Sequence, residues 1–327
     1  GWNRMETRLA KKEDLKELKE IWKLCFGDED SFIDFYFQRR DWVKETAVLV
    51  QDGRIASMLT MIPVDIVGED GGKRRASMLY AIATHPDFRK KGYAEQLIEF
   101  SNEYLLSQQV SVTLLVPAGE GLFRFYGKRG YQDGFTIREA VLRREEIEAL
   151  GAGVPAGAVH TSEPEPLSRQ VRAAAVPAER RVTVKPVEPA EYNRIRKNQL
   201  TGHSRLDYRE EELSFEKQLA RMFGTDLYSI ETGGAEGCAY VERISEEEVI
   251  VKELLIPDQH MAAALIHLSE LLPAEKYIVR TPSFAGGILG GSVRPFGMLR
   301  INGKDARLVN KASNPVDNNS YLGIAYD

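Results

Sequence analysis

The sequence predicts an α+β (α/β) protein whose fold is built twice along the chain. Its 327 residues are enough for about two domains, each with its own core. Segments with helical spacing alternate with short apolar runs that are typical of strands. The order of these elements recurs after residues 151–180, a stretch rich in Ala, Gly, Pro, Ser and Glu. We therefore expect domains at 1–150 and 181–327, joined by a linker or long loop at 151–180.

In the first half, the order of elements is read from spacing and turn signals. Residues 11–25 carry apolar side chains at mostly three- and four-residue intervals, which predicts an amphipathic helix, and a short strand can precede it. A second helix is expected at 31–39, and Asp52-Gly53 predicts a hairpin turn between two strands. The remaining predictions are a strand at 75–84, a helix from Gly92 to about Gln109, a strand at 112–116, a helix at 121–128 and an extended segment at 131–142.

The second half repeats this order. We expect a strand at VTVKPV, helices at 190–200 and 210–222, three strands between 227 and 257, a helix at 261–272 and a strand at 277–280. The segment GGILGGSVRPFG is predicted to be a loop, because it is rich in glycine and no clear helix follows it. The apolar run YLGIAYD closes the chain.

Composition limits the class of protein. The hydrophobic fraction of 43% and the charged fraction of 28% are those of an ordinary globular protein. A net charge of −5 gives no reason to expect nucleic acid, so any anion site should be local. Cys25 and Cys238 show no metal-ligand spacing, and no apolar run approaches the length of a membrane span. We expect a soluble protein of the reducing cytoplasm, without a membrane partner.

The stretch HPDFRKKGYAEQL has three features of an anion site. A strand leads into the turn, Gly92 allows close approach of a ligand, and the start of the next helix offers free amides and the positive end of its dipole. Arg89, Lys90 and Lys91 add positive charge. A solvated basic helix start remains the alternative at this point, since neither a P-loop nor a dinucleotide fingerprint is present.

A second pattern, YGKRGY at residues 126–131, follows the next predicted strand. Together the two patterns resemble the GCN5-related N-acetyltransferase (GNAT) family, which has Arg/Gln-x-x-Gly-x-Gly/Ala at its main helix and Tyr-x-x-x-Gly-Phe/Tyr about thirty residues later. The matching residues are Arg89, Gly92, Ala94, Tyr126, Gly130 and Tyr131. The order of elements over residues 5–145 also agrees with this family.

The resemblance implies a fold for both halves. Each would be a mixed, mostly antiparallel, twisted sheet flanked by helices, as in the Eis-like branch, where an active GNAT domain precedes a degenerate one. Residues 1–150 would bind acetyl-CoA, whereas residues 181–327 would shape the acceptor cleft. In the second half the helix start reads PDQHMA, without the glycine turn, so we expect no CoA there. The third, sterol-carrier-like domain of that branch has no counterpart in these 327 residues.

The resemblance also implies roles for individual residues. The diphosphate of acetyl-CoA would lie on the amides from Lys90 to Ala94, and the pantetheine arm on the strand Ile82-Ala83-Thr84. An amide near Ile82 would polarise the thioester carbonyl, and Tyr126 would protonate the departing thiolate. No metal is expected. The predicted cofactor-binding residues are Ile82, Ala83, Thr84, Arg89, Lys90, Lys91, Gly92, Tyr93 and Ala94.

The acceptor side is less specific. Asp28, Glu29, Asp30 and Asp34 fall where GNAT enzymes build the acceptor pocket, which favours a cationic amine, although a solvated loop is the alternative. In Eis-like enzymes the terminal carboxylate serves as the base, so Asp327 is a second candidate catalytic residue beside Tyr126. The alternative for the carboxyl terminus is a last strand with an exposed end.

The prediction is thus an N-acetyltransferase that moves the acetyl group of acetyl-CoA to a primary amine by direct attack. The acceptor would be a small molecule or a peptide, and a homo-oligomer is compatible with the sequence. Two alternatives stay open: a Fem-type aminoacyl transferase that uses aminoacyl-tRNA, and a non-catalytic module that senses acetyl-CoA. The net charge and the CoA-type turn count against the first.

Overall fold

The computed structural model describes residues 4–153, 181–304, 306 and 319–325. The elements of the first half are β1 (Met5–Leu9), α1 (Leu15–Phe26), α2 (Asp30–Arg39), α3 (Trp42–Glu45), β2 (Thr46–Gln51), β3 (Arg54–Val67), β4 (Lys73–Thr84), α4 (Tyr93–Ser107), β5 (Val112–Leu115), α5 (Glu120–Gly127), β6 (Gln132–Arg143) and α6 (Arg144–Gly151). The helices and strands that the sequence predicts in this half are all present, and α3 and α6 are additional.

The elements of the second half are β7 (Thr183–Pro186), α8 (Pro189–Leu200), β8 (Arg205–Asp207), α9 (Glu210–Met222), β9 (Leu227–Thr232), β10 (Ala235–Arg243), β11 (Glu248–Leu255), α10 (Asp258–Leu271), β12 (Lys276–Thr281) and β13 (Ser292–Ile301). The predicted elements are again found. The sequence did not indicate β8 or β13.

Two predicted features show why the local sequence folds as it does. Helix α1 buries Leu18, Ile21 and Trp22 on one side and ends at Gly27, whose φ of +69° suits a residue without a side chain. The turn between β2 and β3 has positive φ at both Asp52 and Gly53, as expected for a tight hairpin.

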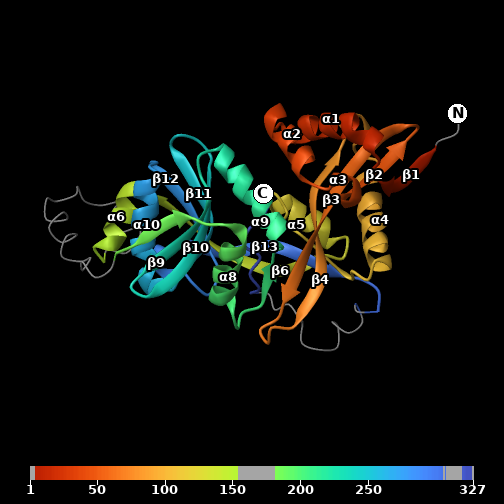
Figure 1. Cartoon of the computed structure of the whole chain (residues 1–327). Coiled ribbons are helices and arrows are strands. Elements are labelled where there is room, and N and C mark those ends of the chain that lie inside the picture. Colours follow the sequence, from red (N-terminus) through yellow and green to blue (C-terminus); the bar gives the residue numbers. More distant parts are fainter. Residues whose placement is uncertain (1–3, 154–180, 305, 307–318, 326–327) are drawn as a thin grey trace.

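The strands form one open, mostly antiparallel sheet flanked by helices (Figure 1). The strand order is β1-β2-β3-β4-β5-β13-β6-β12-β11-β10-β9-β7, and β8 pairs with β3. We expected a sheet in each half, and strand pairing joins the two. Strand β13 lies between β5 and β6, while β6 also pairs with β12, so each half contributes its last strand to the contact between the halves.

The loop prediction for GGILGGSVRPFG is wrong over its second part, because β13 begins at Ser292. Proline and glycine usually argue against a strand, but here Pro295 and Gly297 lie at register shifts against β6. A Cβ on Gly297 would come within 2.9 Å of the Leu322 side chain, so the glycine permits close packing. The first part does remain irregular apart from a short turn at Gly287–Leu289.

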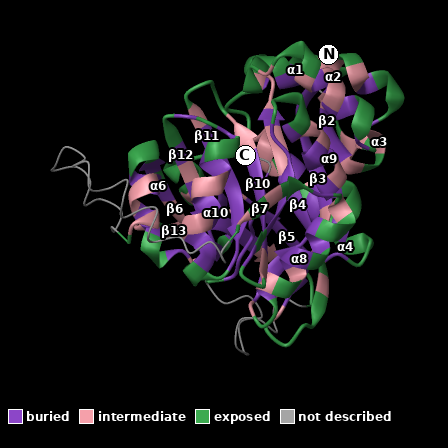
Figure 2. Cartoon of the chain, turned by 60° about the vertical axis from the view of Figure 1, so that its left-hand side comes forward, coloured by how far each residue is buried: buried purple, intermediate pink, exposed green. Residues whose placement is uncertain are grey.

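The described part of the carboxyl-terminal run, residues 319–325, connects β6 and β8 through backbone hydrogen bonds. Ser320 and Tyr321 make isolated bridges to Phe135 and Arg205. Residues 320–325 are buried, and Figure 2 shows how buried residues follow the central strands while exposed ones cover the outer helices. This segment therefore packs as part of the core between the two halves.

Helix α9 brings the second half against the first. Phe215 stacks on Phe35 with ring centroids 5.3 Å apart and meets the Tyr36 ring edge at 5.9 Å. Glu212 accepts two hydrogen bonds from Arg40, of 2.7 and 2.9 Å. In Figure 1, α9 lies in the middle of the molecule.

Candidate functional site

Strand β4 is distorted in the segment predicted to bind the cofactor. Ala81 has φ of +52°, a left-handed conformation that residues with a side chain rarely adopt. Between the β3 pairs made by Tyr80 and Ala83, the two residues Ala81 and Ile82 lie opposite one residue of β3. This is a β-bulge, and bulges are common beside active sites.

The same part of β4 is also separated from β5. The two parallel strands pair only over Ala76–Met78 and Val112–Leu114. Residues 79–84 of β4 therefore have no paired strand on the β5 side within the described chain, and this stretch contains the predicted residues Ile82, Ala83 and Thr84. An open strand edge offers backbone donors and acceptors to an extended ligand.

The turn before α4 forms a concave arrangement of amides. Lys90 and Gly92 have φ of +64° and +75°, and Gly92 is the residue that precedes the helix. The first hydrogen bond of the helix runs from the Gln96 amide to the Gly92 carbonyl, at 3.2 Å. Within the described chain no acceptor is recorded for the amides of residues 91–95, which are thus oriented as an anion site requires.

The basic side chains of this turn are exposed. Arg89 lies with its Nη2 atom 3.9 Å from Cys25 Sγ, and Lys91 lies over the Phe88 ring at 5.7 Å. Lys90 is also exposed. Tyr93 is anchored by a hydrogen bond of 3.1 Å from its hydroxyl to Gln51 Oε1, so it orients the start of the helix.

Glu95 is a neighbour of this turn that the sequence did not single out. A Cβ on Gly92 would lie 2.9 Å from its Oε2 atom. Its other oxygen pairs with Arg129 at 3.0 Å, so the guanidinium offsets the carboxylate beside the predicted diphosphate site. Its position in the first turn of α4 could have indicated a favourable interaction with the helix dipole.

Tyr126 lies on α5, on the same side of the sheet as α4. It is 7% exposed and shares an apolar cluster with Leu79 and Leu97, against which Ile82 also packs. Its ring contacts Tyr131 edge-on at 6.0 Å. Burial, with a smaller effect of Tyr131, raises the pKa of Tyr126 to about 12, so its phenol keeps its proton at neutral pH.

The predicted acceptor carboxylates are mostly paired on the first two helices. Asp28 accepts a hydrogen bond of 2.8 Å from Trp22 Nε1. Asp30 pairs with Lys23 at 2.7 Å, and Asp34 pairs with Lys19 at 2.9 Å. Glu29 precedes α2 as its capping residue. Only Asp28 is thereby linked to the buried aromatic cluster that faces β4.

That aromatic cluster was not predicted as part of the site. Tyr80, next to the bulge, lies 6.0 Å from Trp22 and 6.3 Å from Tyr36 between ring centroids. Burial, with smaller effects of Tyr36, Glu216 and Asp28, raises the pKa of Tyr80 well above its usual value. The sequence signal that could have found it is a tyrosine directly before the predicted cofactor strand.

Asp327 lies outside the described residues, so its predicted role stays a prediction. The described chain ends at Ala325, whose carbonyl accepts a hydrogen bond of 3.4 Å from Lys252 Nζ. The Ile324 carbonyl accepts one from the Tyr208 hydroxyl. The segment leading to the terminus is therefore held by side chains of the second half.

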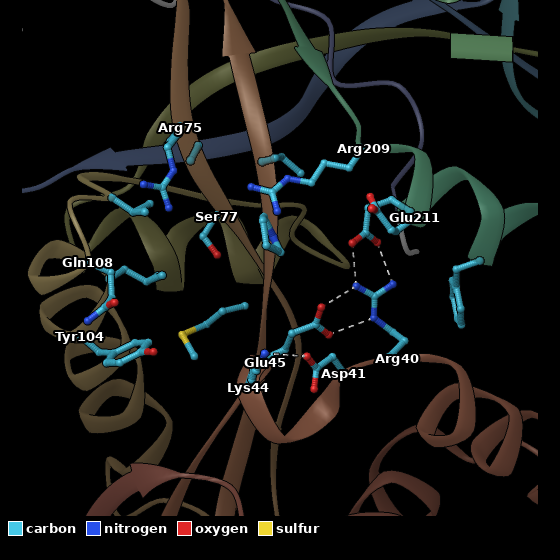
Figure 3. Close-up of a pocket in the computed structure, with 18 of the residues that line it drawn as sticks. Arg40, Asp41, Lys44, Glu45, Arg75, Ser77, Tyr104, Gln108, Arg209 and Glu211 are labelled. Carbon is cyan, nitrogen blue, oxygen red and sulfur yellow. Dashed lines mark hydrogen bonds and ion pairs between the residues drawn. The ribbon is translucent and has the colours of Figure 1, made fainter. Parts of the chain in front are cut away.

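A cavity of about 560 Å³ lies at the opposite end of β4 (Figure 3). It is bordered by Arg75 and Ser77 of β4, the last turn of α4, and α9. Arg40 lies at its wall between Glu45 and Glu212, and burial raises the pKa of Glu45. Since α4 has 15 residues, the two ends of this helix are about 22 Å apart, so the cavity is separate from the turn at Gly92.

In the part of the chain that the structure describes, no group of three or more His, Cys, Asp or Glu side chains could hold a metal ion. No helix among those residues is long and apolar enough to span a membrane. His260 lies in the first turn of α10 and is buried. Its Nε2 atom is 3.3 Å from Gln259 Nε2.

Residues 6–133 match the family model of the acetyltransferase (GNAT) domain. No curated protein matches the sequence. Among solved structures, a GCN5-related N-acetyltransferase from Anabaena variabilis is similar with a TM-score of 0.66 and 16% identity, covering 91% of this chain and 73% of that one.

Two further structures extend over the same share of this chain. A GCN5-related N-acetyltransferase from Kribbella flavida has a TM-score of 0.64 at 12% identity, with 91% of this chain and 71% of that chain covered. Eis1 from Mycobacterium abscessus has a TM-score of 0.60 at 10% identity, with 91% and 73% covered. At these identities the likeness concerns the fold, and it spans both halves.

Proposed function

Because residues 6–133 are a GNAT acetyltransferase domain and the protein is accordingly an acyltransferase, we propose that it moves the acetyl group of acetyl-CoA to a primary amine of a cationic acceptor. The observation that carries this proposal is the bulged, open edge of β4 directly before the amide turn at Gly92. An anion and an extended arm can be bound there by backbone groups alone.

The turn fits the diphosphate of acetyl-CoA. The amides from Lys90 to Ala94 would hold it, and Arg89 can add a bidentate contact from its exposed side chain. Ile82, Ala83 and Thr84 would pair with the pantetheine arm along the open strand edge. The thioester supplies the activated acetyl group, while residues of this chain bind it, polarise its carbonyl and protonate the leaving thiolate.

In this proposal the Ile82 amide polarises the acetyl carbonyl, because the bulge turns the backbone of β4 out of the sheet. The acceptor amine attacks the carbonyl carbon directly, without a covalent enzyme intermediate. Tyr126 then gives its proton to the leaving thiolate. Its buried phenol remains protonated at neutral pH, so the proton is available at each turnover.

The acceptor would lie on the other face of β4. The rings of Trp22, Tyr36 and Tyr80 pack together on this side of the strand, and Asp28 accepts a hydrogen bond from the Trp22 indole. Aromatic faces and a carboxylate stabilise a cationic amine. Glu29, Asp30 and Asp34 would contribute at the entrance, since their exposed positions and lysine pairs leave them in contact with solvent.

The second half, residues 181–327, would form the far wall of the acceptor region through α9, and 151–180 would link the halves. The free thiols of Cys25 and Cys238 agree with a cytoplasmic setting.

The first experiment measures thermal stability with and without acetyl-CoA, followed by thiol release over a panel of small cationic amines and amine-bearing peptides. We expect acetyl-CoA to raise the Tm, because a ligand that binds only the folded chain stabilises it. Absence of any shift would overturn the proposed cofactor. A shift without thiol release from any amine would favour an acetyl-CoA-sensing module instead.

A further inference from the structure

A buried proton network of the second half lies next to the aromatic residues of the proposed acceptor region. Glu216 of α9 is 2% exposed, and Tyr240 of β10 is fully buried. The Tyr240 hydroxyl lies 2.6 Å from Glu216 Oε2 and also within hydrogen-bond distance of Glu242 Oε1. Lys252 of β11 pairs with Glu242 at 3.3 Å. We name these four residues the Glu216 network.

Counting hydrogens shows that this network holds an extra proton. Two contacts of one phenol oxygen with carboxylate oxygens need two hydrogens, whereas the phenol supplies one. One of the two carboxyl groups must therefore be protonated. Glu216 is the more deeply buried of the two carboxyl groups, and burial together with the charge of Glu242 raises the pKa of Glu216 to about 8. The proton lies on Glu216.

The surroundings of Glu216 come from both halves. Tyr240 and Glu242 face it from β10, Lys252 from β11, and Arg40 from the position after α2. The two positive charges favour the ionised form of Glu216. The charge of Glu216 contributes to the raised pKa of Tyr80 on β4. The network therefore lies near Tyr80, the residue that precedes the bulge. The adjacent Phe215 packs on Tyr36, which fixes α9 against the acceptor region.

One atom of the network has no partner. Glu216 Oε1 is buried and makes no hydrogen bond within the described chain. When Oε2 donates its proton to Tyr240, Oε1 is a carbonyl oxygen that can accept another. A buried acceptor without a partner is costly and is common at functional sites. At the other end, the Glu242 side chain is 25% exposed and is therefore in contact with solvent.

Resting on the proposed function, we infer that the Glu216 network removes the proton that the acceptor ammonium must lose before its nitrogen can attack. The ammonium proton passes to Glu216 Oε1, the Oε2 proton moves to the Tyr240 oxygen, and the phenol proton moves to Glu242. Glu242 then releases one proton to solvent. Glu216 thus acts as the group that takes the proton from the acceptor, and Tyr240 and Glu242 pass a proton on to solvent.

The complete transfer balances. The freed lone pair forms the nitrogen–carbon bond while the carbon–sulfur bond breaks, and the thiolate takes the proton of Tyr126. The second proton that the nitrogen loses replaces the one given up by Tyr126. The products are the amide, the thiol and one proton in solvent, with no oxidant or reductant involved.

The test compares Glu216→Gln, Tyr240→Phe and the double variant with the wild type. Each single change interrupts the same relay, so we expect kcat to fall about 100-fold in each, and no further in the double variant. The rise of kcat with pH should move to higher pH in the variants, while the affinity for acetyl-CoA stays unchanged. Multiplicative losses, or an unchanged pH profile, would overturn the relay.

The matched control is Glu212→Gln, one turn earlier on α9. Glu212 is also buried and pairs with Arg40, so this change tests loss of packing and charge at the same surface. We expect a lower Tm but the wild-type pH profile. If Glu212→Gln shifts the pH profile of kcat as much as Glu216→Gln does, both shifts come from a disturbed structure, and the proposal is overturned.

A second measurement needs no acceptor. The infrared spectrum of the protein alone should contain a carboxylic acid C=O band that titrates near pH 8 and is absent in Glu216→Gln. Absence of this band in the wild type would overturn the shared proton, and with it the relay. If the band is present but no amine releases thiol, the proposed acetyl transfer fails, and the two failures are thereby distinguished.

Discussion

Each half of the chain runs from a strand of a parallel pair into its main helix, β4 into α4 and β11 into α10. The start of α4 has Gly92 with positive φ and amides without recorded acceptors in the described chain. The start of α10 has Pro257, and the Asp258 carboxylate accepts a hydrogen bond of 2.9 Å from the Gly286 amide. The first start is open to an anion because its own carboxylate, Glu95, pairs with Arg129. At the second start the Asp258 carboxylate is bound to a backbone amide instead.

This comparison teaches that a repeated fold need not repeat its site. Both helix starts have the favourable dipole end, but backbone geometry and the nearest charge decide whether a diphosphate can bind. The second half contributes instead through α9 and β10, which bring Glu216 and Tyr240 to the acceptor region.

The largest expected effect comes from Tyr126→Phe. Removing the phenol proton should lower kcat about 100- to 1000-fold without changing the Kd of acetyl-CoA, since no proton reaches the thiolate. Steady-state kinetics and calorimetric titration would measure the two quantities. The control is Tyr131→Phe, whose buried hydroxyl contacts Thr113 at 2.8 Å and should affect stability alone. Full activity of Tyr126→Phe would remove this residue from the chemistry.

Gly92→Asp would make the start of α4 resemble that of α10. A carboxylate at the diphosphate site and a side chain at φ of +75° should raise the Kd of acetyl-CoA about 100-fold. Gly224→Asp is the matched control, because Gly224 has φ of +82° with open space around it. Equal losses of affinity in both variants would argue against an anion site at Gly92.

Asp258→Ala tests the second half. Loss of the hydrogen bond to Gly286 should lower the free energy of unfolding by about 1 kcal/mol, measured by urea denaturation. The stoichiometry of acetyl-CoA binding should stay at one per chain, since α10 lacks the glycine turn. A second bound equivalent would show that the two helix starts differ only by this carboxylate.

A further expected effect is on pH-dependent stability. Glu216 binds its proton more tightly in the folded chain, with a pKa of about 8 against 4.5, so folding is favoured at low pH by this group. That contribution is lost as the pH rises from about 5 to about 9. The Tm of the wild type should therefore fall over this range relative to Glu216→Gln. If the difference in Tm between the wild type and Glu216→Gln stays the same over this pH range, the carboxyl group of Glu216 is already ionised at its lower end.

Much of the amino-terminal half could be predicted because its signals are local. The apolar stripe of α1, the Asp52-Gly53 turn and the step from strand into helix at Gly92 each depend on a few neighbouring residues. The family pattern over residues 89–94 and 126–131 lies in the same half, and the match over residues 6–133 confirms the GNAT domain. β13 was missed because Pro295 and Gly297 suit a bulge that only its partner strands define.

The sequence by itself determined the order of elements, the GNAT pattern and the residues of the glycine turn, since spacing and backbone preference act over short distances. The tertiary structure decided which half completes which sheet, that β13 lies between β5 and β6, and that α9 places Glu216 near Tyr80. Such contacts join residues more than a hundred positions apart. Burial and charge at those contacts set the proton affinity of Glu216. Neither can be predicted from the residues next to Glu216 in the sequence.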